Sequence, residues 1–328
     1  GLLDTKAIDA GAYHTCVLRS SGTASCWGYN FYGQLGDGSI TNRLVPTPVP
    51  NLSGVVQLDA GGFDGHTCAV LGSGAAQCWG RNNYGQLGDG TNIDSSTPRS
   101  VNGLASVIQI ATAAGHTCAL AAGQVRCWGD NRVGQIGDGS TTTRNTPGAA
   151  ITGLTNVVEI VADGNHTCAR RNTNEVYCWG ANGYGQLGDG TSIDRHAPVL
   201  VSGLVATRLA VGLLHTCALT ATGDVACWGY NDSGQLGDGT TADKLTPVQA
   251  NSLAGITAVS GGQHHSLFLK NNGTVWACGR NIAGQLGDGT NTNRTTPVLV
   301  SSLTGIFSVK AGGSHSLFLK NDGTLRAC

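Results

Sequence analysis

Residues 26–38 read Cys-Trp-Gly-Tyr-Asn-Phe-Tyr-Gly-Gln-Leu-Gly-Asp-Gly, and close copies of this stretch recur along the chain. The Gly-Gln-Leu/Ile-Gly-Asp-Gly core begins again at Gly85, Gly134, Gly185, Gly234 and Gly284. Runs this rich in glycine are typical of tight turns between short strands, because glycine adopts backbone conformations that other residues avoid. The stretch therefore predicts a loop that is used once in each unit of a repeated fold.

A second element recurs with the loop. A histidine followed by a short apolar run is found at His14, His66, His116, His166, His215, His265 and His315. The steps are about 50 residues, which is the scale of propeller blades. After each histidine come the apolar run, a turn and a second short run, which ends Cys-Trp-Gly in the first five units. A proline-valine strand and an apolar linker close the unit.

Each unit thus offers four short β-type runs separated by Gly, Asn and Asp turns. No long window shows a helical period. Four strands in each of seven repeats predict an all-β fold, a seven-bladed β-propeller, in which radial closure protects the sheet edges. A parallel β-helix has a repeat about half this length or less, and an open solenoid needs distinct capping repeats, which do not stand out here.

The phrase Gly-x-Asn-x-x-Gly-Gln-Leu-Gly-Asp-Gly, preceded by His-Thr-Cys or His-Ser-Leu, resembles the regulator of chromosome condensation repeat. The resemblance covers essentially the whole chain, and it implies a single propeller domain over residues 1–328 of the bacterial secreted type. Kelch propellers have a similar period, but their double glycine and spaced aromatic residues are not found. In the resembling family, loops at the blade ends bind partner proteins. Examples are a nucleotide exchange factor for a small GTPase and a secreted β-lactamase inhibitor.

The seventh repeat departs from this pattern. It stops at Cys328, before its glycine loop and final strand. Two explanations stay open: the chain is a fragment of a longer protein, or its N-terminal segment completes the last blade. We favour the fragment.

The cysteines form pairs that flank predicted hairpins, so the two members of a pair should face each other on neighbouring strands. The pairs are Cys16 with Cys26, Cys68 with Cys78, Cys118 with Cys127, Cys168 with Cys178, and Cys217 with Cys227. Disulfides at these positions would indicate an oxidising compartment, whereas zinc would require Cys-x-x-Cys spacing, which is absent from the sequence. In the last two repeats both members are replaced, and Cys278 and Cys328 occupy the tryptophan position instead. We expect these two to be free or paired outside the repeat rule.

The repeated polar residues are interpreted as structural. Each repeat histidine is expected to hydrogen-bond a neighbouring backbone group and fix its own blade, because a catalytic site needs asymmetry. The six Asp-Gly pairs are expected to cap turns rather than bind calcium, since the loops lack alternating acidic residues. No set of acid, base and nucleophile can be singled out, so neither an enzyme nor a bound metal or cofactor is expected.

The composition of the chain limits the kinds of partner that it can bind. Glycine is abundant, at 51 residues, charged residues make up 12% of the chain, and the formal net charge is -1. A balanced charge offers no basic face for nucleic acid, and the apolar runs are too short to insert into a membrane.

Functional differences between repeats are expected in the loops, because shared residues build the scaffold. Aromatic and large apolar residues on polar, glycine-rich loops are typical of protein-binding surfaces. The partner-binding candidates are Tyr13, Phe63, Leu213, Leu214, His264, Tyr29 and Phe31. Tyr32, Tyr84 and Tyr184 share one position and could equally pack between blades.

The sequence therefore predicts an extracellular or cell-surface scaffold that binds another protein through its variable blade-end loops. Two other functions stay open: a structural subunit that self-assembles on a cell surface or appendage, and a glycan-binding propeller whose tyrosines stack on sugars.

Overall fold

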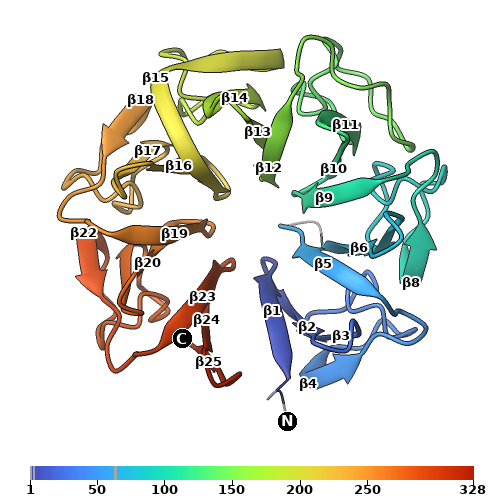
Figure 1. Ribbon diagram of the computed structural model, residues 1–328, viewed down its shortest axis with the longest axis horizontal. Coiled ribbons are helices and arrows are strands. Elements are labelled where there is room, and N and C mark those ends of the chain that lie inside the picture. Colours follow the sequence, from blue (N-terminus) through green and yellow to red (C-terminus); the bar gives the residue numbers. More distant parts are fainter. Residues whose placement is uncertain (1, 3, 63–64) are drawn as a thin grey trace.

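The computed structural model describes residues 2, 4–62 and 65–328, and every regular element in these ranges is a strand. In these ranges the strands form six hydrogen-bonded sheets, and the largest sheet contains two antiparallel units that share one strand, which makes seven units. The units surround a central axis (Figure 1). The predicted all-β propeller is therefore confirmed, but in the described ranges the third and seventh units have three strands each and not the predicted four. Within the described ranges, no helix is present that could cross a bilayer.

Each unit is built from strands in chain order, from the axis outward. The innermost strands are β1 (Thr5–Ala10), β5 (Val55–Ala60), β9 (Val107–Thr112), β12 (Val157–Asp163), the end of β15 (Arg195–Val211), β19 (Ile256–Gly261) and β23 (Ile306–Ala311). The second strands are β2 (His14–Arg19), β6 (His66–Leu71), β10 (His116–Ala121), β13 (His166–Arg171), β16 (His215–Thr220), β20 (His265–Lys270) and β24 (Ser316–Lys320). The third strands are β3 (Ala24–Gly28), β7 (Ala76–Gly80), β11 (Gln124–Gly129), β14 (Glu175–Gly180), β17 (Val225–Gly229), β21 (Val275–Gly279) and β25 (Leu325–Ala327). The outer strands are β4 (Arg43–Pro48), β8 (Ser95–Ser100), the start of β15, β18 (Lys244–Gln249) and β22 (Arg294–Leu299).

One strand is shared between two neighbouring units, and the first and last units meet without sharing a strand. Strand β15 pairs with β14 through its first part and with β16 through its last, so one strand serves two neighbouring units. The last sheet has three strands, β23-β24-β25, while β1 belongs to the first sheet and pairs with β2. Within the described ranges, the N-terminal segment therefore does not supply a fourth strand to the last unit. The first and last units meet side by side and close the ring (Figure 1).

The predicted cysteine pairs are confirmed as disulfides across the hairpins of second and third strands. Cys16 lies opposite Cys26 in the β2–β3 ladder, and the five bridged pairs have Cα separations of 4.1–4.2 Å. Cys278 and Cys328 are free, which is one of the two outcomes that the sequence predicts for them. At the pair positions of the sixth unit, Leu267 lies opposite Ala277.

The hydrophobic core is divided into clusters that lie between neighbouring units. In each of the first four clusters, a disulfide of one unit packs with the tryptophan of the next, for example Cys16 and Cys26 with Trp79. Trp79 is fully buried. Because each unit covers its apolar face with its neighbour, the fold depends on closure of the ring.

The sixth unit fills the same space with a different pair of residues. Where the fifth unit has Ala218 and Trp228, the sixth has Phe268 and Cys278, all fully buried. A small-to-large change in the second strand thus accompanies a large-to-small change in the third. Since cores tolerate substitutions that conserve total volume, this exchange explains why a cysteine can occupy the tryptophan position.

Candidate functional site: the loop face and the central pocket

The glycine loops are closed by their own side chains. Asn30 Oδ1 accepts from Leu35 N at 2.9 Å, and Asn30 Nδ2 donates to the Thr41 carbonyl at 3.0 Å. The Asp37 carboxylate accepts from Ser39 N at 2.9 Å and pairs with Arg43 at 2.7 Å. These are the bonds that the turn-capping interpretation predicts. No group of three or more metal-ligating side chains is placed to hold an ion in the described parts of the chain.

The repeat histidines join neighbouring units instead of fixing their own. His66 Nε2 lies 2.8 Å from Thr117 Oγ1 of the next unit, and that hydroxyl donates to the Gln86 carbonyl at 2.8 Å. Trp128 Nε1 donates to the same carbonyl at 2.9 Å. Since the hydroxyl proton is used by the carbonyl, His66 must donate from Nε2 and leave Nδ1 unprotonated. The expectation of a backbone partner within the same blade is wrong, because the histidine lies at the interface between blades.

Two sets of loops lie at the same end of the ring, which we call the loop face. Because the first three strands of a unit run up, down and up, the loop between the first and second strands meets the loop that follows the third. In the first unit Tyr29 N donates to the Tyr13 carbonyl at 2.9 Å. The loops with most of the sequence differences between repeats are thus held together on one surface by a rigid scaffold.

An aromatic loop cluster, formed by Tyr13, Tyr29, Phe31 and Tyr32, lies on this face. Tyr13 packs edge-on against Tyr29 with ring centroids 6.2 Å apart, and Phe31 packs edge-on against Tyr32 at 5.1 Å. The exposed fractions are 52% for Tyr13, 37% for Tyr29 and 61% for Phe31. Large apolar rings that remain this exposed while contacting one another form a patch, unlike scattered surface residues.

The shared tyrosine position lies between units. The Arg132 guanidinium of the third unit lies 4.7 Å from the Tyr84 ring of the second and donates to its hydroxyl at 3.0 Å. Tyr184 contacts Tyr230 of the next unit at 4.6 Å, and Tyr230 contacts His264 of the unit after at 5.8 Å. These rings therefore connect blades, although Tyr184 also remains 41% exposed.

The other predicted contact residues are less accessible or are not described. Leu213, Leu214 and His264 are half-buried. Leu213 lines the cavity at the centre of the ring. Phe63 lies outside the described residues. The structure thus groups Tyr13 with Tyr29 and Phe31, and it places Leu213 nearer the axis.

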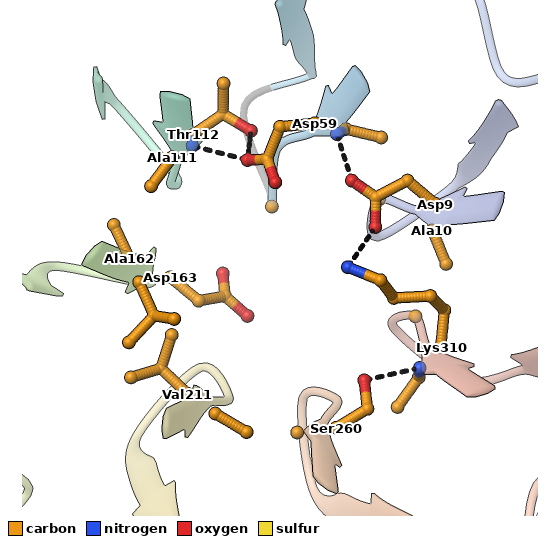
Figure 2. A pocket seen from close by; sticks show the side chains of 18 of the residues that line it. Asp9, Ala10, Asp59, Ala111, Thr112, Ala162, Asp163, Val211, Ser260 and Lys310 are labelled. Carbon is orange, nitrogen blue, oxygen red and sulfur yellow. Dashed lines mark hydrogen bonds and ion pairs between the residues drawn. The ribbon is translucent and has the colours of Figure 1, made fainter. Parts of the chain in front are cut away.

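A central pocket of about 420 Å³ runs between the innermost strands. Several of its polar groups come from the fifth position of these strands, counted from Ala206 in β15. This position is occupied by Asp9, Asp59, Ala111, Val161, Ala210, Ser260 and Lys310. Figure 2 shows carboxylates and an ammonium group that converge there, with alanine and valine side chains between them.

Most of the polar groups in the central pocket form hydrogen bonds or ion pairs with the innermost strand of a neighbouring unit. Asp9 accepts from Ala60 N at 2.7 Å and pairs with Lys310 at 2.9 Å across the seam between the first and last units (Figure 2). Asp59 accepts from the backbone and hydroxyl of Thr112, both at 2.6 Å. Burial, and then the neighbouring Asp9, raises the pKa of Asp59 to about 7. The Asp9 charge raises the pKa of Lys310.

Comparison with protein-family models identifies the repeat. The model of the RCC1-like domain matches residues 96–328, and models of the regulator of chromosome condensation (RCC1) repeat match residues 6–34, 55–86 and 21–70. The chain belongs to the RCC1-like domain family. Because one model spans more than half of the chain, this membership does not depend on a single motif.

Among curated relatives, this RCC1-like domain is 30% identical to human E3 ubiquitin-protein ligase HERC2 over 216 residues, which is 63% of this chain and 4% of HERC2. It is 32% identical to the ultraviolet-B receptor UVR8 of Arabidopsis thaliana over 204 residues, which is 61% of this chain and 46% of UVR8. The alignments thus span less than half the length of either relative.

Solved structures share the fold of this RCC1-like domain. Human WBSCR16 superposes with a TM-score of 0.85 at 24% identity, covering 96% of this chain and 86% of that one. Prp20p of Saccharomyces cerevisiae superposes with a TM-score of 0.82 at 24% identity, covering 97% and 83%.

The pocket residues of this RCC1-like domain were missed by sequence reasoning. Asp9, Asp59 and Lys310 lie in strands, whereas repeat differences were sought only in loops. The same criterion applied to the innermost strands would have marked them, because their fifth position changes from carboxylate to alkyl to ammonium around the ring. Asp163, at the end of β12, is a further difference of this kind.

Proposed function

We propose that this RCC1-like domain is a non-catalytic module that binds another protein through its loop face. The observation that carries the proposal is the aromatic loop cluster, in which Tyr13, Tyr29 and Phe31 remain exposed while their rings contact one another. Tyrosine and other aromatic residues dominate the binding energy of protein interfaces because they bury large rigid surfaces. Prp20p, which shares the fold, has been studied for its binding to Gsp1p and histones, and has been solved bound to Kap60.

The scaffold beneath the cluster limits the entropic cost of binding. Tyr29 N bonds the Tyr13 carbonyl, and Tyr32 lies under the Arg81 guanidinium of the next unit at 4.7 Å. Rings held in this way lose little freedom when a partner docks, and preorganisation of this kind increases affinity.

We further propose that the protein acts in an oxidising compartment, outside the cell or at its surface. Five disulfides in one domain support this proposal, because such bonds persist where thiols are not kept reduced. Alkylation of the unfolded, unreduced protein isolated from its source should label only Cys278 and Cys328. Labelling of all twelve cysteines would contradict an oxidising location.

The binding proposal is tested by capture of a partner from material of the protein's source. Wild type and a Tyr13→Ala/Phe31→Ala variant would be immobilised side by side, and the affinity for any captured protein measured. We expect a loss of at least about tenfold in the variant, because each exposed ring at an interface contributes about 1–2 kcal/mol or more.

Ile108→Ala serves as the matched control, because Ile108 is 64% exposed near the start of innermost strand β9, at the end of the strand opposite the loop face. Equal binding by all three proteins would place the interface elsewhere. Capture of the chain by itself alone, unchanged in the Tyr13→Ala/Phe31→Ala variant, would favour a self-assembling structural subunit.

A further inference from the structure

Asp163 differs from the other carboxylates of the central pocket, because its side chain forms no hydrogen bond with a neighbouring innermost strand among the described residues. In the part of the chain that the structure describes, its Oδ1 accepts only from the next backbone amide, Gly164 N, at 2.6 Å. Its Oδ2 has no hydrogen bond to any described residue, and Figure 2 shows the carboxylate pointing towards the middle of the pocket. The side chain reaches Gly62 of the second unit, where a β-carbon would collide with Oδ1. Glycine at this position therefore leaves room for the carboxylate.

The charges that face the pocket do not balance. Lys310 neutralises Asp9 at 2.9 Å, and Arg170 neutralises Glu159 at 2.8 Å. Asp59 is hydrogen-bonded only to uncharged donors, and Asp163 only to a backbone amide. Among the described residues, these two carboxylates thus have no ion-pair partner of their own, although the charge of Lys310 also acts on Asp59. Burial raises the pKa of Asp163 to about 6, because a buried carboxylate loses the hydration of its charge.

A second unsatisfied group lines the same pocket. Gln263 Nε2 is buried and has no hydrogen-bond partner among the described residues. A buried amide donor without a partner costs about 1–3 kcal/mol. A ligand that brings an oxygen acceptor would satisfy it.

The dimensions of the pocket favour an organic ligand over a metal ion. Among described residues, the carboxylates do not converge as a set of three metal ligands. A volume of about 420 Å³ lies within the range of sites for small organic molecules. The walls beside the carboxylates include Ala111, Ala162 and Val211, which offer alkyl surface (Figure 2).

We propose that the central pocket binds a small organic cation, whose ammonium or guanidinium group donates to Asp163 while its alkyl chain packs on the apolar wall, and that Asp59 adds negative charge to the pocket. This site goes beyond partner binding and does not rest on the loop face.

The test is a titration of the whole domain with 4-amino-1-butanol and agmatine, followed by saturation-transfer NMR, with 1,4-butanediol as the uncharged probe. We expect saturable binding of the two cations and none of the diol. Asp163→Asn keeps an oxygen to accept from Gly164 N but removes the charge, so it should weaken cation binding by at least about tenfold. Because the probes contain no protein, failure here would leave the loop-face proposal untouched.

Asp322→Asn is the matched control, because Asp322 lies in an exposed hairpin turn where the sixth unit naturally has Asn272. Cation binding by this variant should equal that of wild type. Binding should also tighten from about pH 5 to pH 8, as Asp163 and Asp59 lose their protons. The adjacent His166 stays neutral over this range, since burial lowers its pKa to about 3. Failure of both cations to bind, equal binding by Asp163→Asn, or displacement of the cations by equimolar Mg²⁺ would overturn the proposal.

Discussion

The hydroxyl that follows each repeat histidine connects two units through a single oxygen. Thr117 Oγ1 lies between His66 Nε2 and the Gln86 carbonyl, and it is fully buried. The sixth and seventh units have serine at this position, Ser266 and Ser316, and make the same contacts. The requirement is therefore for a hydroxyl and not for threonine as such.

Thr117→Val should lower the free energy of unfolding by about 1–3 kcal/mol, because it leaves the His66 donor and the Gln86 acceptor buried without this partner. Urea denaturation followed by tryptophan fluorescence would measure the change. Thr117→Ser, which restores the oxygen, should remain within about 1 kcal/mol of wild type. A valine variant as stable as the serine variant would show that this hydroxyl contributes little.

At the scale of strands, the fifth and sixth units fill the same core position with two different pairs of side chains. Phe268 and Cys278 fill the space that Ala218 and Trp228 fill one unit earlier, and each pair packs against the preceding hairpin. The Cys278 thiol also keeps the contact of the tryptophan nitrogen, since Sγ lies 3.4 Å from the Gln235 carbonyl. Burial raises the pKa of this thiol far above its usual value, so it is inert at neutral pH.

Trp228→Cys alone should destabilise the protein by about 3–5 kcal/mol, because it leaves a large cavity beside the Cys168–Cys178 disulfide. Adding Ala218→Phe should recover much of this loss, as the sixth unit predicts. Ala218→Phe by itself should be destabilising through overpacking. A double-mutant cycle from thermal unfolding would measure the coupling, and purely additive effects would contradict the volume exchange.

At the scale of the whole molecule, buried histidines at the unit interfaces make the ring sensitive to acid. Burial lowers the pKa to about 4 for His14 and His116, and to about 3 for His66, His166, His215 and His265. Their value in an unfolded chain is about 6.5. A base whose pKa is lower in the folded state stabilises the fold above its unfolded pKa, and loses that contribution as the pH falls.

Stability should therefore fall steeply as the pH drops from about 6.5 to about 4.5. The raised pKa values of Asp59 and Asp163 act in the opposite direction, because these groups bind protons more readily in the folded state. These two carboxyl groups offset only part of the effect of the six histidines. Urea midpoints at several pH values would measure the net effect. His116→Gln should make the dependence shallower by about one proton, whereas His196→Gln, at an exposed side chain, should leave it unchanged.

Local features of the molecule could be predicted from the sequence. The strands, the turns and the Cys16–Cys26 type of disulfide depend on contacts between residues about ten positions apart, so spacing alone specifies them. Because the units repeat, an assignment made for one unit applies to the equivalent residues of the other units. For the same reason, the exposed position of Tyr13 and Phe31 on loops followed from where these residues fall within their unit.

Contacts between units could be assigned only from the tertiary structure. Asp9 meets Lys310, and His14 meets Thr67, across sequence separations that no local pattern reports. The same holds for Leu213, a loop residue that turns towards the axis and lines the central pocket. Whether a side chain faces solvent, the next blade or the pocket depends on how the units are rotated about the axis. That rotation is set by packing between units, which is an interaction of the closed ring as a whole.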